Sequence, residues 1–447
     1  MFKSSVFVVI MMSNLIFSQK TYTLNQCIEQ ALAANLSVQV KEVNTQLAQE
    51  QLKQSYRNLL PVINAGSDYS IRYGRSVDPN TNAISTTDFF TNNYSIDASL
   101  TIFQGFLKHY QISVAKWAKF SAAAEGKQQR FKVIEQLLPA FFQVAFTENL
   151  IAVSEEELKI VKELAVVTQK KFKLGKQSQA DVYDVNANLQ EAHLNLVKAK
   201  NNFANAKLRM QQLMNINSEN FKLIVTPFAT QKPSKNNEAN NKDLFEKAQE
   251  VLPELEQFSF TQKALKKQLH ATQSELFPTI NVFAGFGTGF FKTNIDPVTN
   301  RTIGFRRQLI DNASQYVGAT IQLPIFNQWN IRSRIKQQRL ALVEGDLNRR
   351  QKVQELFQLT KQLKQQEKAL KETVLWSEKR QQAIALSYTT TEKKYGHGLI
   401  ALLDVLQVKN ELFKAKVDYR QAKQQLAMNA QIINLYSGKF NSILAVE

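Results

Sequence analysis

The side chains that most often bind metal ions or act as nucleophiles are few and scattered in this chain. Its four histidines have no second His or Cys at the spacing of a metal site. They are His109, His193, His270 and His397. The sequence contains no phosphate-binding loop, dinucleotide fingerprint or nucleophile elbow. We therefore predict no enzyme active site, no cofactor and no metal site.

Two short motifs, one in each half of the chain, are the candidate functional sites. They are related by an offset of 223 residues and comprise Phe172, Gly175, Ser178, Asp181 and Val182 in the first copy and Tyr395, Gly398, Asp404 and Val405 in the second. Glycine tolerates the backbone of a tight turn, and an Asp in the first turn of a helix favours the helix start. Each motif therefore predicts a turn between two helices, in which the glycine permits the turn and the Asp caps the returning helix.

The segments that follow the two motifs predict the packed helices that must position them. From Val182 to Leu213, apolar residues alternate at spacings of three and four, and the same offset gives a similar series from Val405 to Tyr436. Upstream, each motif is preceded by a long stretch, at about 106–172 and 329–395, in which Pro139 of the first copy is the one strong stop signal. Helices of this length would be on the order of 100 Å long.

The repeat extends over most of the chain. Leu100-Thr-Ile-Phe103 returns as Leu323-Pro-Ile-Phe326, and Leu60-Pro61 returns as Phe277-Pro278. We predict two structural repeats, residues 20–226 and 242–447, joined by a polar connection at 227–241. In each repeat the order is a helix (about 24–59 and 242–277), a strand, a loop, a strand, a very long helix, a turn and a helix.

Four segments change to a period of two, which predicts amphipathic strands at about 62–73, 94–103, 280–290 and 317–325. Their length suits tilted membrane-spanning strands. Open sheet edges are not tolerated in lipid, so several copies would have to close one barrel. Its lumen would be lined by Asn64, Asp68, Arg72, Asp97, Ser99, Thr320 and Gln322. The alternative is an ordinary amphipathic sheet over a soluble core.

Targeting signals and charge narrow the class of protein. Residues 1–19 combine Lys3, a short apolar stretch and a small residue, which predicts a secretory signal peptide, with a buried N-terminal element as the alternative. Beyond them we find no apolar run of about 18 residues, so we do not expect a helical membrane protein. The net charge of +18 comes from Lys and Arg scattered along helical faces, so we expect no nucleic-acid binding. Cys27, the single cysteine, is predicted to lie in a helix core.

In this order and duplication, the motifs resemble those of the TolC-like outer membrane efflux protein family. The resemblance covers almost the whole chain after residue 19, including the helix that contains Cys27, Leu60-Pro61, Phe277-Pro278 and both turn motifs. It implies an α+β membrane protein that forms a homotrimer. In the trimer, four strands per subunit complete a twelve-stranded barrel in the lipid of the outer membrane, continued by a helical tunnel into the periplasm.

The resemblance also implies that the turn motifs form a closable inner mouth and dock a periplasmic adaptor, which is attached to an inner-membrane pump. Two departures bear on this mouth. Ala401 stands where the first motif has Ser178, and the region offers Lys173 and Lys176 in the first copy and Lys393, Lys394 and His397 in the second. An acidic selectivity ring at the mouth is therefore in doubt.

We expect a passive outer-membrane exit duct of a tripartite efflux pump or a type I secretion system. Cargo would leave between the loops that contain Asp78 and Asp296. The alternative is a soluble periplasmic coiled-coil adaptor or scaffold, which explains the helices but leaves the four amphipathic strands without a purpose. The sequence does not identify the cargo, the adaptor or the pump.

Overall fold

The computed structural model describes residues 20–77, 82–86, 89–217, 221–224, 241–299 and 301–440. The predicted signal peptide, residues 78–81 of the first predicted loop and residues 227–240 of the predicted connection lie outside them. The described residues divide into two compact units: unit 1 takes those within 1–41, 126–253 and 353–447, and unit 2 takes those within 42–125 and 254–352. Each unit therefore draws on both predicted repeats.

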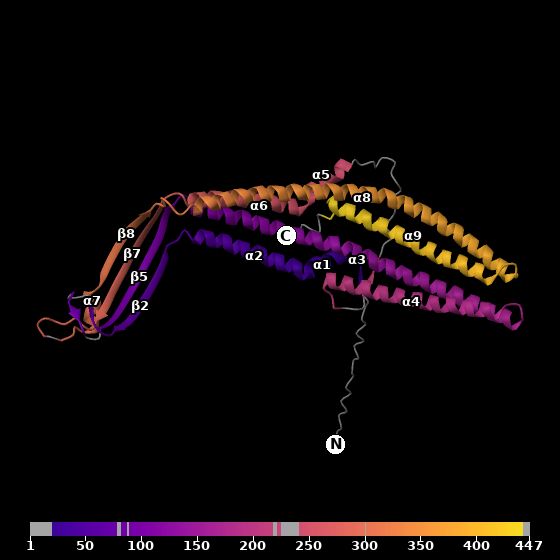
Figure 1. Cartoon of the computed structure of the whole chain (residues 1–447), viewed down its shortest axis with the longest axis horizontal. Helices are drawn as coiled ribbons and strands as arrows, with labels where there is room; N and C mark the ends of the chain where they lie inside the picture. The colour runs from indigo at the N-terminus through magenta and orange to yellow at the C-terminus, as the bar shows by residue number, and fades with distance from the viewer. Residues whose placement is uncertain are drawn as a thin grey trace, which may run out of the picture. The chain divides into compact units, whose positions relative to one another are not determined.

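Unit 2 contains a four-stranded antiparallel sheet in the order β2-β5-β7-β8 (Figure 1). The strands are β2 Val62–Arg72, β5 Phe89–Gln104, β7 Thr279–Phe291 and β8 Ser314–Gln322. All four predicted strands are confirmed. The predicted bounds of two were wrong: β5 begins at Phe89, about five residues before the predicted start. β8 begins three residues earlier than predicted and ends before Pro324, which cannot donate a ladder hydrogen bond.

The strand register places polar and apolar side chains on opposite faces of this sheet. Asn64 lies opposite Asp97, Asp97 opposite Gly285, and Gly285 opposite Tyr316, so the four share a face. The same register puts all seven predicted lumen residues on that face. The other face carries the apolar set, which is largely uncovered: Ile63, Ile96 and Val317 are 66%, 53% and 87% exposed.

Two glycines on the polar face give room to aromatic rings from the neighbouring strand. A Cβ atom on Gly285 would collide with the ring of Tyr316, whose hydroxyl donates a hydrogen bond to Asp97. A Cβ atom on Gly318 would likewise meet the ring of Phe283. Gly289 of β7 is also crowded, because a Cβ atom there would collide with the Asn93 side chain, whereas Gly287 has only an ordinary contact at 3.7 Å.

A short helix, α7 Phe305–Asp311, covers the end of β7 beyond the last β8 pair. The buried Gln308 side chain accepts a hydrogen bond from Phe291 N (2.9 Å) and donates to Phe291 O (3.0 Å). Asn312 Nδ2 donates to Gly289 O at 2.7 Å. Side chains thus continue the ladder where β8 stops. Two further strands, β3 Ser76–Val77 and β4 Ile84–Ser85, pair with each other.

Each of the two shorter predicted helices is broken once. Residues 24–59 form α1 Leu24–Ala34 and α2 Leu36–Arg57, and residues 242–277 form α5 Asn241–Val251 and α6 Pro253–Ser274. At the first break the Asn35 side chain accepts a hydrogen bond from Ser37 N at 3.0 Å. At the second, Pro253 disfavours helical backbone at Leu252 and starts the next helix. Both breaks stand the same distance before the repeated Leu/Phe-Pro pairs.

The long helices match their predicted positions closely. They are α3 Leu107–Lys173 and α8 Asn330–Gly396, each of 67 residues, followed by α4 Gln179–Met214 and α9 Leu402–Tyr436. In unit 1, α4 folds back beside α3 and α9 beside α8 (Figure 1). The predicted seam of α4 is confirmed at its buried positions Val182, Val185, Ala192, Ala199, Ala206 and Met210.

The core of unit 1 includes the middle of α3, where Phe131, Ile134, Leu137 and Phe141 are almost fully buried. We expected no apolar run of about 18 residues after the signal peptide. This was wrong, because an 18-residue window of α3 has a mean hydropathy of 1.4, so that α3 could span a membrane by length and composition alone. Of that window, 56% is buried inside the molecule. A core helix meets the same requirement, and the buried side chains account for the apolar run here.

The beginning of the described chain is tied into unit 1. Strand β1 Lys20–Tyr22 pairs in parallel with β6 Phe221–Leu223, a pair that the sequence analysis did not predict. Cys27 on α1 is fully buried, as predicted, and burial raises the pKa of its thiol to about 12. A thiol with so high a pKa stays protonated and has little nucleophilic character at neutral pH.

Candidate functional site at the helical turns

Both candidate motifs form turns between antiparallel helices of unit 1. Gly175 and Gly398 have φ angles of +67° and +74°, in the left-handed region that glycine adopts without strain. The prediction that these glycines permit the turns is therefore confirmed. A Cβ atom at either position would meet no neighbouring atom within 4 Å. The cost of replacing these glycines is thus one of backbone conformation.

The ends of α3 and α8 close with equivalent backbone hydrogen bonds. Lys176 N donates to Lys171 O at 2.9 Å, and at the same place in the second turn Leu399 N donates to Lys394 O at 3.0 Å. These bonds satisfy carbonyl groups that the last helical turn leaves unpaired, which is typical of helix ends that terminate in a left-handed glycine. The two turns therefore share one backbone design.

The starts of the returning helices differ. Ser178 Oγ accepts a hydrogen bond from Asp181 N at 3.1 Å, and Ser178 N donates to Asp181 Oδ2 at 3.0 Å, which is a complete capping box. The hydrogen bond from the Ser178 hydroxyl holds the pKa of Asp181 below its usual value. At α9, Ala401 provides no side-chain hydrogen bond. Asp404 lies in that first turn, where its charge suits the helix dipole, but no capping box forms there.

Tyr395 joins the end of α8 to the end of α3. Its side chain is 3% exposed, and its hydroxyl lies 3.0 Å from the Oγ1 of Thr168, which is fully buried. Lys171 Nζ donates to Tyr395 O at 2.6 Å and also lies 3.8 Å from the centre of the Tyr395 ring. We call this contact the Tyr395 lock. It was not visible in the sequence, because its partners lie on segments 224 and 227 residues apart.

The lock lies in a shielded environment. Burial raises the pKa of the Tyr395 phenol, with a smaller opposing effect of the Thr168 hydrogen bond and a further rise from the charge of Asp181. Burial lowers the pKa of Lys171, and the nearby positive charge of Lys176 lowers it further. The neutral phenol is therefore the form that the closed contact favours.

An apolar cluster surrounds the lock and draws on all four helices. Tyr395 packs in it with Leu164 of α3, Val185 of α4 and Val405 of α9. Val182 is also buried, whereas Phe172, the counterpart of Tyr395 in the first turn, is only half-buried. Of the motif residues, the structure thus brings Tyr395 and Val405 into one core and leaves Gly175, Ser178 and Gly398 at the surface.

A buried ion pair connects α9 with α3 in the same unit. Lys409 Nζ donates to Glu157 Oε1 at 3.0 Å, and the two side chains are 3% and 6% exposed. Asn195 of α4 donates to the other carboxylate oxygen at 3.5 Å. A more exposed pair, Lys416 with Glu156 at 2.8 Å, joins the same two helices. Lys409 was not predicted as a buried charge, because a lysine beside an apolar seam looks like a solvated position in the sequence.

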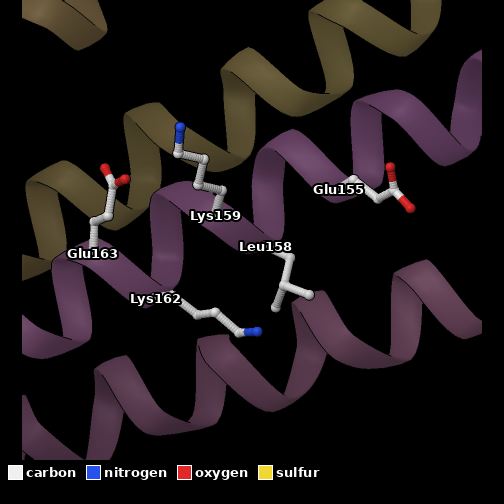
Figure 2. Close-up of a pocket in the computed structure, with 5 residues that line it drawn as sticks. All are labelled: Glu155, Leu158, Lys159, Lys162 and Glu163. Atoms are coloured by element: carbon white, nitrogen blue, oxygen red, sulfur yellow. The ribbon is translucent and has the colours of Figure 1, made fainter.

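A shallow groove of about 300 Å³ lies on α3, along residues that stand on either side of Glu157 in the sequence (Figure 2). Its lining is mainly charged, with both signs present at helical spacing: Glu155, Leu158, Lys159, Lys162 and Glu163. Such a lining is typical of a solvated helix face. Among the residues that the structure describes, no three His, Cys, Asp or Glu side chains form a group that could hold a metal ion.

Comparison with known proteins identifies the class to which this architecture belongs. The family model described as outer membrane efflux protein matches residues 27–215 and 244–439. The outer membrane protein TolC of Escherichia coli (strain K12) is 22% identical over 428 residues, which cover 94% of this chain and 82% of that protein. TolC of Salmonella enteritidis is 23% identical over 436 residues, with the same coverage.

Solved structures share the fold. The CmeC outer membrane channel of Campylobacter jejuni superposes with a TM-score of 0.76 at 15% identity, covering 93% of this chain and 85% of that one. The open state of the MtrE outer membrane channel of Neisseria gonorrhoeae gives a TM-score of 0.71 at 17% identity, with coverages of 93% and 88%.

These matches decide between the two functions that the sequence left open, because they are to channels and not to a soluble adaptor or scaffold. TolC-like channels are outer-membrane homotrimers that extend into the periplasm and work with periplasmic adaptors and inner-membrane pumps; they are not an enzyme family. The chain belongs to the outer membrane efflux protein family and is an outer-membrane exit duct for efflux or secretion.

Proposed function

We propose that this protein is a passive duct that is closed at the two turns of unit 1 and opens there when a periplasmic adaptor and its pump engage. The observation that carries the proposal is the Tyr395 lock, which ties the α3–α4 hairpin to the α8–α9 hairpin one turn before both glycine turns. Separation of the hairpins would break this contact. Opening is then a shift between two populations, which a partner biases by binding the open one better.

The motif residues have distinct roles in this proposal. Gly175 and Gly398 shape the turns, Ser178 and Asp181 hold the start of α4, and Asp404 holds the start of α9 through its charge. Val182 and Val405 anchor the returning helices in the core, and the exposed turn surfaces next to Phe172 and Tyr395 are the candidate adaptor contact. A duct of this kind performs no reaction of its own, and the energy for transport comes from the pump.

Unpaired surfaces support assembly into a trimer. β2 and β8 each leave one edge without a partner strand among the described residues, which lipid does not tolerate. On α8, Leu340, Val343 and Leu347 follow heptad spacing and are 60%, 56% and 57% exposed. Neighbouring copies would pair the edges and cover this apolar stripe.

The sheet then has one face toward the lumen and one toward lipid. We assign the polar face, with Asn64, Asp68, Arg72, Asp97, Ser99, Thr320 and Gln322, to the lumen. The uncovered apolar face suits lipid, since alternate residues of a barrel strand point in opposite directions. We keep the two repeats at 20–226 and 242–447 as part of the same proposal, with equivalent elements built twice. Efflux and protein secretion both remain compatible with this duct.

Conductance of the purified protein in planar bilayers tests the closed mouth. Tyr395→Phe removes the hydroxyl but keeps the ring, so it should increase the conducting fraction of channels that are otherwise mostly closed. Tyr388→Phe is the matched control, because this buried tyrosine lies on the same helix but its hydroxyl bonds Glu392 one turn along α8. Channels that fail to appear with either variant or with the unchanged protein would contradict the duct. Equal behaviour of the two variants would contradict the lock.

A further inference from the structure

A row of aromatic rings crosses the apolar face of the sheet at the end where α7 lies, opposite the end where the strands lead into α3 and α8. Tyr69 on β2, Phe90 on β5 and Phe290 on β7 have successive ring-centre distances of 4.6 and 5.7 Å, and the row continues to Phe305 of α7 at 5.5 Å. Aromatic rows of this kind occur at the membrane–water interface of barrels. The row therefore indicates the depth at which the apolar face would meet lipid headgroups.

Lys292 lies two residues after Phe290, beyond the aromatic row and on the same face of the sheet. It follows Phe291, the last residue of β7, and its backbone N donates to Phe90 O at 3.1 Å, so the strand register continues through it. Because side chains alternate between faces, Lys292 points the same way as Phe290. A lysine at this depth can lay its apolar stem along the aromatic row and hold its charge among the headgroups.

Helix α7 is held in place on this face and carries a second positive charge, that of Arg306. Besides Gln308 and Asn312, Thr288 of the apolar face donates from Oγ1 to Leu309 O at 2.7 Å, and Phe305 packs on Phe290. The helix is therefore held against the lipid-facing side of β7. Arg306, the residue after Phe305, is exposed on α7. Ile310, four residues after Arg306 and therefore on the same side of the helix, is 67% exposed.

Two acidic side chains of the described residues in this region, Asp311 and Asp296, are already engaged. Asp311 accepts a hydrogen bond from Arg307 Nε at 2.8 Å, and Asp296 accepts from the backbone of Val298 and Thr299 at 2.8 and 3.1 Å. Within the part of the chain that the structure describes, Lys292 and Arg306 have no ion pair. Two positive charges thus stand beside exposed apolar side chains on a surface continuous with the apolar sheet face.

We propose that Phe290, Lys292, Phe305, Arg306 and Ile310, here called the rim patch, bind the phosphate-bearing headgroup of a glycolipid in the outer leaflet of the outer membrane. The inference rests on the proposed assignment of the apolar face to lipid. The strand ends opposite the patch lead into the helices, which are periplasmic in this family, so the patch lies at the outer leaflet. The aromatic and aliphatic groups contact acyl chains, while Lys292 and Arg306 pair with phosphate.

Native mass determination of the full-length trimer, titrated in mild detergent with bis-phosphorylated lipid A or with its dephosphorylated form, tests this proposal. The unchanged protein should bind the phosphorylated lipid more tightly. Lys292→Gln/Arg306→Gln should weaken that binding by roughly fivefold for each charge and about thirtyfold in all. The matched control is Lys266→Gln/Arg349→Gln, which removes the same two charge types from exposed positions on α6 and α8 and should change nothing.

The charge-preserving variant Lys292→Arg/Arg306→Lys should bind the phosphorylated lipid as the unchanged protein does. This result would show that the double Gln variant loses binding because it loses charge and not because it misfolds. Equal binding of the two lipids by the unchanged protein would overturn the proposal, and so would a double Gln variant that binds as tightly as the unchanged protein. The mass of the trimer is read in the same experiment. If the unchanged protein were not a membrane trimer, the proposed function would fail with the inference, whereas a trimer without phosphate preference would overturn the inference alone.

Discussion

Ser178 and Ala401 occupy equivalent positions before α4 and α9, with similar extended backbones, and differ in one hydroxyl group. Replacing a capping serine by alanine costs about 1 kcal/mol. Ser178→Ala should therefore loosen the first turn of α4, and Ala401→Ser, which creates a capping box with Asp404, should tighten the first turn of α9 by a similar amount. Amide hydrogen exchange of the two turns measures both changes. If either variant changed the hydrogen exchange of both turns equally, the idea that each hydroxyl group acts only on the start of its own helix would be contradicted.

The Tyr395 lock should respond to alkaline pH. Because burial raises the pKa of the phenol in the folded protein, the contact contributes stability below the ordinary tyrosine pKa of about 10 and loses it as the pH rises through the higher folded value. Channel conductance should consequently increase above about pH 10. The increase should be absent in Tyr395→Phe, which is open more often at every pH. An identical alkaline increase in that variant would assign the titration to another group.

At the scale of elements, the two ion pairs between α3 and α9 form a matched comparison. Lys409→Met leaves Glu157 buried without its charge partner and should lower the free energy of unfolding by about 3 to 5 kcal/mol. Lys409→Met/Glu157→Leu removes both charges and should recover most of this loss. Lys416→Met, at the more exposed pair, should cost about 0 to 1 kcal/mol. Denaturant unfolding measures all three, and a double variant as unstable as Lys409→Met would contradict the desolvation argument.

The buried pair also has a structural consequence for the helices. Heptad seams with alternating large and small residues, such as that of α4, allow neighbouring helices to slide by one heptad at small cost. A charge that is satisfied only at one register prevents this. Asn429 of α9 acts in the same way: it is buried in the seam and donates to Leu363 O at 3.1 Å. Polar groups inside the seams therefore set the register of α9 against α3 and α8.

At the scale of the whole molecule, the exposed stripe on α8 should control assembly. Each Leu or Val that moves from water into an interface contributes about 1.5 to 3 kcal/mol. Leu340→Glu/Leu347→Glu should therefore weaken the trimer strongly, with monomers appearing in native mass determination in mild detergent. Gln337→Glu/Asn348→Glu adds the same charges on another side of α8 and should leave the trimer intact. Monomers from both variants would point to net charge instead of the stripe.

The amino-acid sequence by itself determined the elements and their faces. The scarcity of stop signals located the two longest helices within about one residue at each end. A period of 3.5 located the helices that follow them, and a period of 2 located the four strands, because these periods reflect which side of an element is buried. Glycine located both turns, because the left-handed backbone there needs it. The family followed from the order and duplication of these motifs.

Only the tertiary structure decided which distant side chains meet. The partners of Tyr395 and Lys409 lie more than 200 residues away, and no local pattern specifies them. The same holds for α7, which is fixed to β7 by Gln308, and for Tyr316, whose ring fills the space above Gly285. Periodicity states that a face is buried, but the identity of what buries it depends on how the chain returns to that place.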